Sequence, residues 1–322
     1  MNKADLRQKR SLKETIFLGD MGILVALIVL CVVMGILSPV FFSVDNWKNI
    51  LVQVSINAVI AAGMGMVILT GGIDLSVGAI VAVCGLVLGV VMVYNDGPIW
   101  QAVVLSCLVG TAFGAANGLL IAKLKMPPFI ATLGMMSIAR GFAYTISDGT
   151  PIYMYPKKFL AVAGNLGPIP IPIIIMVAVF VVAFYILKYT KLGRYTYAIG
   201  GSESAAILSG INVPLYKFII YTITGFLCSI SAIILTARID SAIAVAAEGY
   251  ELDAIGAVVI GGTSMLGGEG RISGTIIGVL IYGVVSNGLN LLTVPQGNQR
   301  IIKGIIIIVA VLIDVLRKRK RV

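Results

Sequence analysis

The chain is 322 residues long, 59% of them hydrophobic and only 12% charged, with a formal net charge of +10 and a mean hydropathy of +1.03. Because a soluble domain of this length lacks the polar surface to cover so much apolar material, the composition excludes a soluble globular protein and predicts a polytopic membrane protein. Histidine is absent, which removes the commonest metal ligand and the usual general base, so we expect neither a metal site nor a catalytic residue.

The positive charge is concentrated at the two ends of the chain. Residues 1–15 hold five Lys or Arg residues, and residues 317–322 hold five more of the 24 in the chain. Cytoplasmic segments of membrane proteins are enriched in these residues, so both tails are expected in the cytoplasm. Positive-inside topology therefore accounts for the net charge, and we expect no nucleic-acid partner.

In chain order, the first half of the sequence predicts five membrane-spanning helices. Ser38-Pro39 ends the first apolar run, the turn signal at 95–98 ends the third, and Pro127-Pro128 opens the fifth. The predicted spans are 16–37, 49–70, a third from the interruption at 70–78 to 94, 99–122 and 127–146. The aromatic, proline-containing loop over 147–167 is expected outside the membrane.

The second half predicts five more spans. They cover 168–187, 215–237, 252–266, 272–292 and 299–316, and the piece over 252–266 is short and broken by glycine. Ten crossings return the carboxyl terminus to the side of the amino terminus, as the two basic tails require. We therefore predict a single all-α polytopic transmembrane domain over 1–322, with about ten helices and both termini in the cytoplasm.

A polar island at 189–214 separates two of these spans. Ser202 is suited to cap a short helix, Glu203 places a negative charge in its first turn, and Gly210 is suited to end it. Three cations, Lys188, Lys191 and Arg194, precede the helix and indicate the cytoplasmic face. The helix either transmits force from a partner or merely joins two spans.

Two glycine-rich interruptions break the apolar runs. TGGIDLSVG occupies 70–78 and IGGTSMLGGEG occupies 260–270. With one gap, the segment over 65–78 resembles the segment over 256–268, either through an internal repeat or because glycine-rich turns look alike. Paired glycine-interrupted segments in the two halves of a membrane protein indicate a transport pathway.

Polar residues inside apolar segments supply the candidates for this pathway. Uncharged groups suit a neutral polyhydroxylated solute, although hydrogen bonding between helices would use the same residues. For Asp74 we favour a local structural role, in which the carboxylate accepts hydrogen bonds from backbone amides freed by Gly71 and Gly72. The candidates are Asn57, Thr70, Asp74, Asn117, Thr263, Ser264, Asn287 and Asn290.

The sequence holds no energy source of its own. No GxxxxGK[ST] phosphate loop is present, so we expect no nucleotide or other cofactor bound by this chain. The apolar spans also lack a dense set of acidic residues for proton coupling. A separate ATPase acting on the polar island would supply the energy.

Five segments, in this order, resemble the membrane permeases of bacterial ABC importers for ribose and related monosaccharides. They are SPVFFSVDNWKNILVQVSINAVIAAGM at 38–64, LTGGIDLSVGAI at 69–80, PPFIATLGMMSIARG at 127–141, KLGRYTYAIGGSESAAILSGINV at 191–213 and GYELDAIGAVVIGGTSMLGGEGRISGT at 249–275. The resemblance covers essentially the whole chain. It implies a multi-pass protein of the bacterial cytoplasmic (inner) membrane that moves a sugar by alternating access, and it does not fix the sugar.

The resemblance also implies partners. They are a cytoplasmic ATPase that uses ATP and Mg²⁺, an extracytoplasmic sugar-binding protein, and a second permease chain that is identical or closely related. Membrane lipid surrounds the chain. The implied coupling helix comprises Gly201, Ser202, Glu203, Ala205, Ala206, Ser209 and Gly210. The alternative reading, a stand-alone secondary sugar carrier, gives no reason for this helical island.

Overall fold

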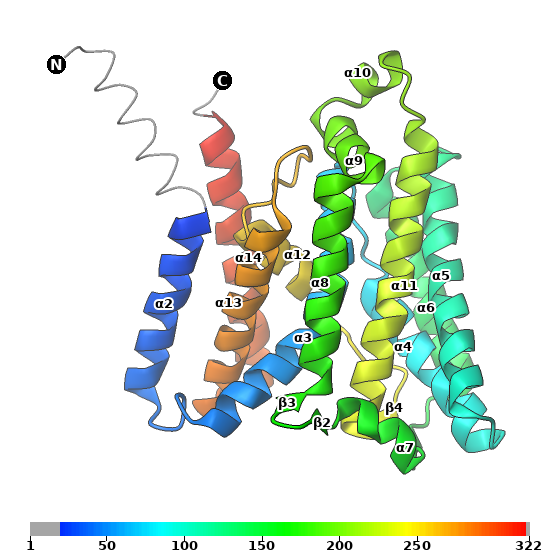
Figure 1. Ribbon diagram of the computed structural model, residues 1–322, viewed down its shortest axis with the longest axis vertical. Helices are drawn as coiled ribbons and strands as arrows, with labels where there is room; N and C mark the ends of the chain where they lie inside the picture. Colours follow the sequence, from blue (N-terminus) through cyan, green and yellow to red (C-terminus); the bar gives the residue numbers. More distant parts are fainter. Residues whose placement is uncertain (1–19, 320–322) are drawn as a thin grey trace.

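The computed structural model describes residues 20–319 and forms a bundle of roughly antiparallel helices (Figure 1). The long helices are α2 (Asp20–Leu37), α3 (Val44–Leu69), α4 (Val77–Gly89), α5 (Ile99–Ala122), α6 (Pro128–Ser147), α8 (Ile171–Tyr189), α11 (Val213–Ile239), α12 (Tyr250–Ile260), α13 (Ile272–Leu291) and α14 (Gln296–Arg319). The predicted tail over 1–15, the first four residues of the span over 16–37 and residues 320–322 lie outside the described residues.

Seven helices in the described part of the chain are long and apolar enough to cross a membrane. They are α3, α4 with the π-helical turn η1 (Val90–Tyr94) that extends it, α5, α6, α8, α11 and α13. The prediction of an all-α polytopic membrane protein is confirmed for these seven helices.

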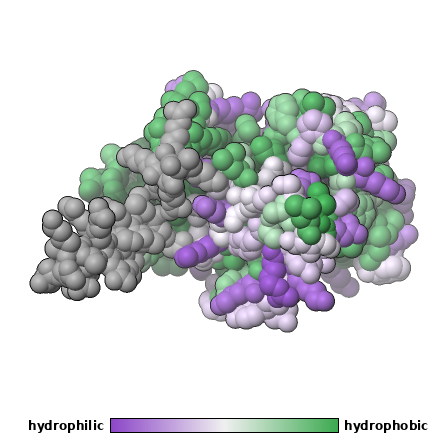
Figure 2. All heavy atoms as spheres, turned by 90° about the horizontal axis from the view of Figure 1, so that it is seen from above, coloured by the Kyte–Doolittle hydropathy of each residue, from purple (hydrophilic) through white to green (hydrophobic). Residues whose placement is uncertain are grey.

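Short elements lie at the two ends of the bundle (Figure 1). At one end, β1 (Ile152–Tyr153) pairs antiparallel with β4 (Ser241–Ala242), and β2 (Asn165–Leu166) pairs with β3 (Ile169–Pro170). The same region contains α7 (Lys157–Leu160) and η2 (Ala161–Ala163). The opposite end carries α9 (Lys191–Gly201) and α10 (Glu203–Leu208). Figure 2 looks onto this second end, where hydrophilic residues are spread over much of the surface.

Helix α3 is the centre of the bundle, since most of its side chains are buried against α8, α11, α12 and α13. The packing of α5 on α11 depends on glycine, because a Cβ at Gly114 would meet the Tyr221 carbonyl and one at Gly225 would meet the Gly110 carbonyl. Small residues of this kind let two helix backbones approach closely within a membrane. The core is therefore built around a buried helix and close glycine contacts.

Two predicted boundaries are wrong for local reasons. Helix α3 begins at Val44, not at 49, because the Ser43 hydroxyl caps it by accepting a 3.3 Å hydrogen bond from the Asn46 amide. The apolar piece over 252–266 is helical only from Tyr250 to Ile260. Gly262 follows with a φ of +85°, which ends the helix and leaves residues 263–270 as a loop.

Candidate functional site

The polar island folds as two short helices joined at Ser202. The Ser202 hydroxyl accepts a 3.3 Å hydrogen bond from the Ala205 amide and caps α10, and Gly210, with a φ of +78°, follows its end. The predicted short helix is therefore present. Helix α9, which precedes α10, was not predicted. The Thr190 hydroxyl caps α9 by accepting a 3.3 Å hydrogen bond from the Gly193 amide. The sequence signal for this second helix was the threonine before KLGRYTYAIGG.

Helix α10 presents an apolar tip to solvent. Leu208 is 89% exposed and Ile207 is 56% exposed, whereas Ala206 is buried against Ile199 and Val213. The other predicted coupling residues, Gly201, Ser202, Glu203, Ala205, Ser209 and Gly210, are exposed. These two neighbouring exposed side chains are the apolar part of α10 that a partner protein could contact.

Glu203 has a partner within the chain. Its carboxylate lies 2.7 Å from the Lys217 ammonium of α11, and the two side chains are 53% and 16% exposed. An ion pair this exposed contributes little to stability. The pair joins the first turn of α10 to the beginning of α11.

Helix α9 rests directly on both glycine interruptions. The Gly268 amide donates a 3.0 Å hydrogen bond to the Leu69 carbonyl, which joins the turn after α12 to the end of α3. A Cβ at Gly200 would meet both of these groups, so α9 touches the two interruptions where they meet. Each interruption could be recognised in the sequence by its glycines. The contact of α9 with both of them is long-range, and no local signal predicts it.

Tyr197 adds a polar contact between α9 and the second interruption. Its hydroxyl donates a 3.0 Å hydrogen bond to the Gly270 carbonyl. Burial raises the pKa of the Tyr197 phenol, although Arg271 has the opposing effect, so the hydroxyl remains a donor at neutral pH. This hydrogen bond ties α9 to the loop that precedes α13.

Asp74 is fully buried in a polar cluster within the first interruption. Its Oδ1 accepts hydrogen bonds from the Ser76 amide at 2.9 Å and the Ser76 hydroxyl at 2.6 Å. The Asn117 amide group donates to the Ser76 hydroxyl at 2.8 Å and approaches the Asp74 carboxylate at 3.4 Å. The carboxylate therefore accepts from a backbone amide of the interruption, as expected, while the Gly71 and Gly72 amides themselves donate to the Ile68 and Val67 carbonyls, within the turn that ends α3.

The remaining predicted pathway residues are scattered, mostly in contacts between elements. Asn287 exchanges hydrogen bonds of 2.9 and 3.2 Å with Asn46, and the exposed Asn290 accepts one of 2.9 Å from Gln299. Thr263 and Ser264 are buried in the second interruption, where the Ser264 hydroxyl donates to Asp314 at 3.4 Å. The Thr70 hydroxyl donates to the Val67 carbonyl at 2.7 Å.

Asn57 lines a polar cavity. The cavity has a volume of about 80 Å³ and lies between α3, α12, α13 and α14, with Gln53, Tyr250 and Ser286 also in its wall. Within it the Lys303 ammonium lies 2.7 Å from the Asp253 carboxylate. The Asn57 Oδ1 atom is buried and accepts no hydrogen bond from any described residue. A solute hydroxyl or a water molecule would satisfy this acceptor.

Arg140 of α6 binds the segment between β4 and α12. Its guanidinium donates hydrogen bonds to the Ala244 carbonyl at 2.5 Å and the Ala246 carbonyl at 3.0 Å. These contacts hold the segment between β4 and α12 against α6.

Comparison with known proteins agrees with this architecture. Residues 46–311 match the family model described as "Branched-chain amino acid transport system / permease component". The chain is 46% identical over 303 residues to the ribose import permease protein RbsC of Haemophilus influenzae, covering 92% of this chain and 94% of that protein. It is 48% identical over 297 residues to RbsC of Bacillus subtilis, covering 91% and 92%.

A third relative is named for a different sugar, D-allose. The D-allose transport system permease protein AlsC of Escherichia coli K12 is 36% identical over 314 residues, covering 97% of this chain and 96% of that protein. No solved structure gives a significant match to the chain. With seven long apolar helices among its described residues, the chain is a multi-pass protein of the bacterial cytoplasmic (inner) membrane and belongs to the transport-system permease family that the matching model describes.

Proposed function

We propose that this chain is the membrane permease subunit of an ATP-driven importer that carries ribose or a related monosaccharide by alternating access. The two ribose import permeases are 46% and 48% identical to it over more than nine-tenths of its length, and the allose permease is 36% identical. The observation that carries the ATP-driven mechanism is the docking of α9 on both glycine interruptions.

The coupling path begins at the apolar tip of α10. A cytoplasmic ATPase that holds Ile207 and Leu208 would pull on α9 when it closes around ATP and Mg²⁺. Helix α9 would then move the end of α3 through Gly200 and the loop before α13 through Tyr197. ATP hydrolysis belongs to that partner, and this chain supplies no catalytic residue.

Ten crossings remain our proposal for the topology. Helices α2, α12 and α14 would add three crossings to the seven long apolar helices. The first described residues of α2, the last of α14 and the α9–α10 pair all lie at the same end of the bundle (Figure 1), which supports cytoplasmic termini. Helix α12 has 11 residues and is about 16 Å long, so the loop over 261–271 would complete its crossing.

A second copy of the chain would complete the pathway. Most of the predicted polar residues are buried within one chain, but α6 exposes a row of small or polar residues: Gly134, Ser137, Gly141 and Thr145. A Cβ at Gly134 or Gly141 would meet no described atom within 4 Å. Such a face suits close packing against another helix or contact with a polar solute better than contact with lipid. We propose that the sugar route runs beside this face of α6.

The extracytoplasmic sugar-binding protein would dock at the end of the bundle that carries α7 and the two short strand pairs. The segments over 147–167 and 238–253 meet there through the pairing of β1 with β4. The Tyr155 amide also donates a 3.0 Å hydrogen bond to Asp240. These contacts make the two segments one surface, which a partner can bind as a unit.

Sugar uptake into membrane vesicles tests this function. Vesicles that contain the chain with its ATPase and binding protein should accumulate ribose only when ATP is supplied, and allose and arabinose would rank the specificity. Vesicles that lack the ATPase or the binding protein are the controls. Uptake by the chain alone would make it a secondary carrier and would remove the coupling role of α9 and α10.

A further inference from the structure

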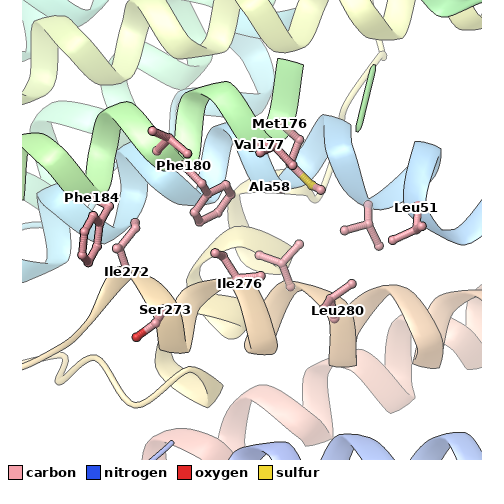
Figure 3. Close-up of a pocket in the computed structure, with 13 residues that line it drawn as sticks. Leu51, Ala58, Met176, Val177, Phe180, Phe184, Ile272, Ser273, Ile276 and Leu280 are labelled. Carbon is pink, nitrogen blue, oxygen red and sulfur yellow. The ribbon is translucent and has the colours of Figure 1, made fainter. Parts of the chain in front are cut away.

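An open apolar groove runs between α3, α8 and α13. It has a volume of about 360 Å³ (Figure 3). Figure 3 shows side chains from all three helices around the same space: Leu51, Ala58, Phe180, Phe184, Ile276 and Leu280. A sugar would find almost no hydrogen-bonding partner along these walls, so the groove does not fit the proposed solute.

The groove ends in a cationic pocket beside α9. This second cavity, also about 360 Å³, shares Phe184, Ile272 and Ser273 with the groove and adds Lys188, Tyr197 and Arg271. The Lys188 ammonium lies 5.0 Å from the ring centre of Phe184 and 5.2 Å from that of Tyr189. The aromatic rings thus hold one cation at the mouth of the groove, on the side of the molecule that carries the coupling helices.

The length of the groove along α8 matches the thickness of one leaflet of a bilayer. Met176, the residue of α8 in the groove farthest from the cations, and Lys188, at the cationic end, are 12 positions apart, which is about 18 Å along the helix axis. The hydrocarbon core of a bilayer is about 30 Å thick, so one leaflet accounts for about 15 Å. A chain bound along the groove would have its head group at the cations and its tail near the middle of the membrane.

We propose that this groove binds one anionic phospholipid of the cytoplasmic leaflet, with its phosphate at Lys188 and Arg271 and an acyl chain along α8 and α13. Charge complementarity selects an anionic head group, and the apolar walls select a ligand with a hydrocarbon tail. Basic pockets between membrane helices on the cytoplasmic side are known to bind such lipids. The site joins α8, which leads into α9, to the first turn of α13, so the lipid would contact both elements that bracket the coupling path.

Lipid retention measured by native mass spectrometry tests the site. The full chain, purified from vesicles of equal parts phosphatidylglycerol and phosphatidylcholine, should retain about one phosphatidylglycerol per chain. Lys188→Glu should lower this retention at least fivefold because it reverses the charge at the head group. The matched control is Lys123→Glu, which changes an exposed lysine after α5 that lines neither cavity and should leave retention unchanged.

A second pair of variants tests the groove. Ile276→Trp should lower phosphatidylglycerol retention at least fivefold by filling the groove, whereas Val182→Trp, on the exposed face of α8 outside both cavities, should not. All four side chains are at least partly exposed, and size-exclusion chromatography checks that each variant folds.

Three outcomes would overturn the proposal. Equal retention by Lys188→Glu and Lys123→Glu would remove the cationic pocket from lipid binding. Displacement of the retained lipid by millimolar inorganic phosphate would indicate a site for a free anion. A loss of dimer in Ile276→Trp with unchanged lipid retention would show that a second copy of the chain covers the groove.

Discussion

Individual polar residues in this chain are satisfied by partners far away in the sequence. Asn117 reaches Ser76 and Asp74 across 41 and 43 positions, and Asn46 reaches Asn287 across 241. Their polarity inside apolar segments could be recognised from the sequence, and a buried role for Asp74 was expected. Their partners could not be recognised, because which helix faces lie together depends on the packing of the whole bundle.

Asn117→Ala should destabilise the protein. The substitution removes the 2.8 Å hydrogen bond to the Ser76 hydroxyl and leaves the buried Asp74 carboxylate with one donor fewer. Loss of a buried hydrogen bond of this kind costs about 1–3 kcal/mol of unfolding free energy. Thermal unfolding in detergent should therefore show a lower midpoint. Asn290→Ala, at an exposed asparagine, should change the free energy by no more than about 0.5 kcal/mol. Equal effects of the two variants would contradict the structural role of the cluster.

At the scale of elements, local signals predict helices well and their docking poorly. The span over 99–122 is the same as α5, because Pro98 precedes it and Lys123 follows it. The helix capped by Ser202 was also predicted, since its cap residue and terminal glycine are close in sequence. The contact of α9 with both interruptions was missed. It joins residues near 69, 200 and 268, and glycine leaves no side-chain pattern to reveal it.

Gly200→Ala should uncouple transport from the ATPase. The new Cβ would meet the Leu69 carbonyl and the Gly268 amide, so α9 would have to move away from the two interruptions. Overpacking of this kind costs about 1–3 kcal/mol. We expect ATP-dependent ribose uptake to fall at least tenfold while the ATPase still binds. Gly304→Ala in α14 is the control, because its Cβ would meet no described atom within 4 Å. Normal uptake by Gly200→Ala would show that this contact does not transmit the movement.

At the scale of the whole molecule, charge and hydropathy alone predicted that successive connections between the helices lie at opposite ends of the bundle. The structure places α10 at one end of the bundle and the β2–β3 hairpin at the other, as the predicted ends of the spans require (Figure 1). The groove between α3, α8 and α13 had no signal in the sequence, because its apolar side chains look like those of any buried helix face. The hypothesis of an internal repeat stays a prediction, since meeting at a common contact does not require a duplicated origin.

Ten crossings make a definite statement about which turns face the cytoplasm, and cysteine labelling in intact cells can test it. The native cysteines are first replaced by alanine: Cys31, Cys84, Cys107 and Cys228. A membrane-impermeant maleimide added from outside should then label Asn165→Cys in the β2–β3 hairpin but not Ser204→Cys in α10, both of which are exposed positions. After the membrane is permeabilised, both should be labelled, because only the bilayer protected the second. Labelling of Ser204→Cys in intact cells would place α10 outside, where no cytoplasmic ATPase can reach it, and the coupling mechanism would fail with the topology.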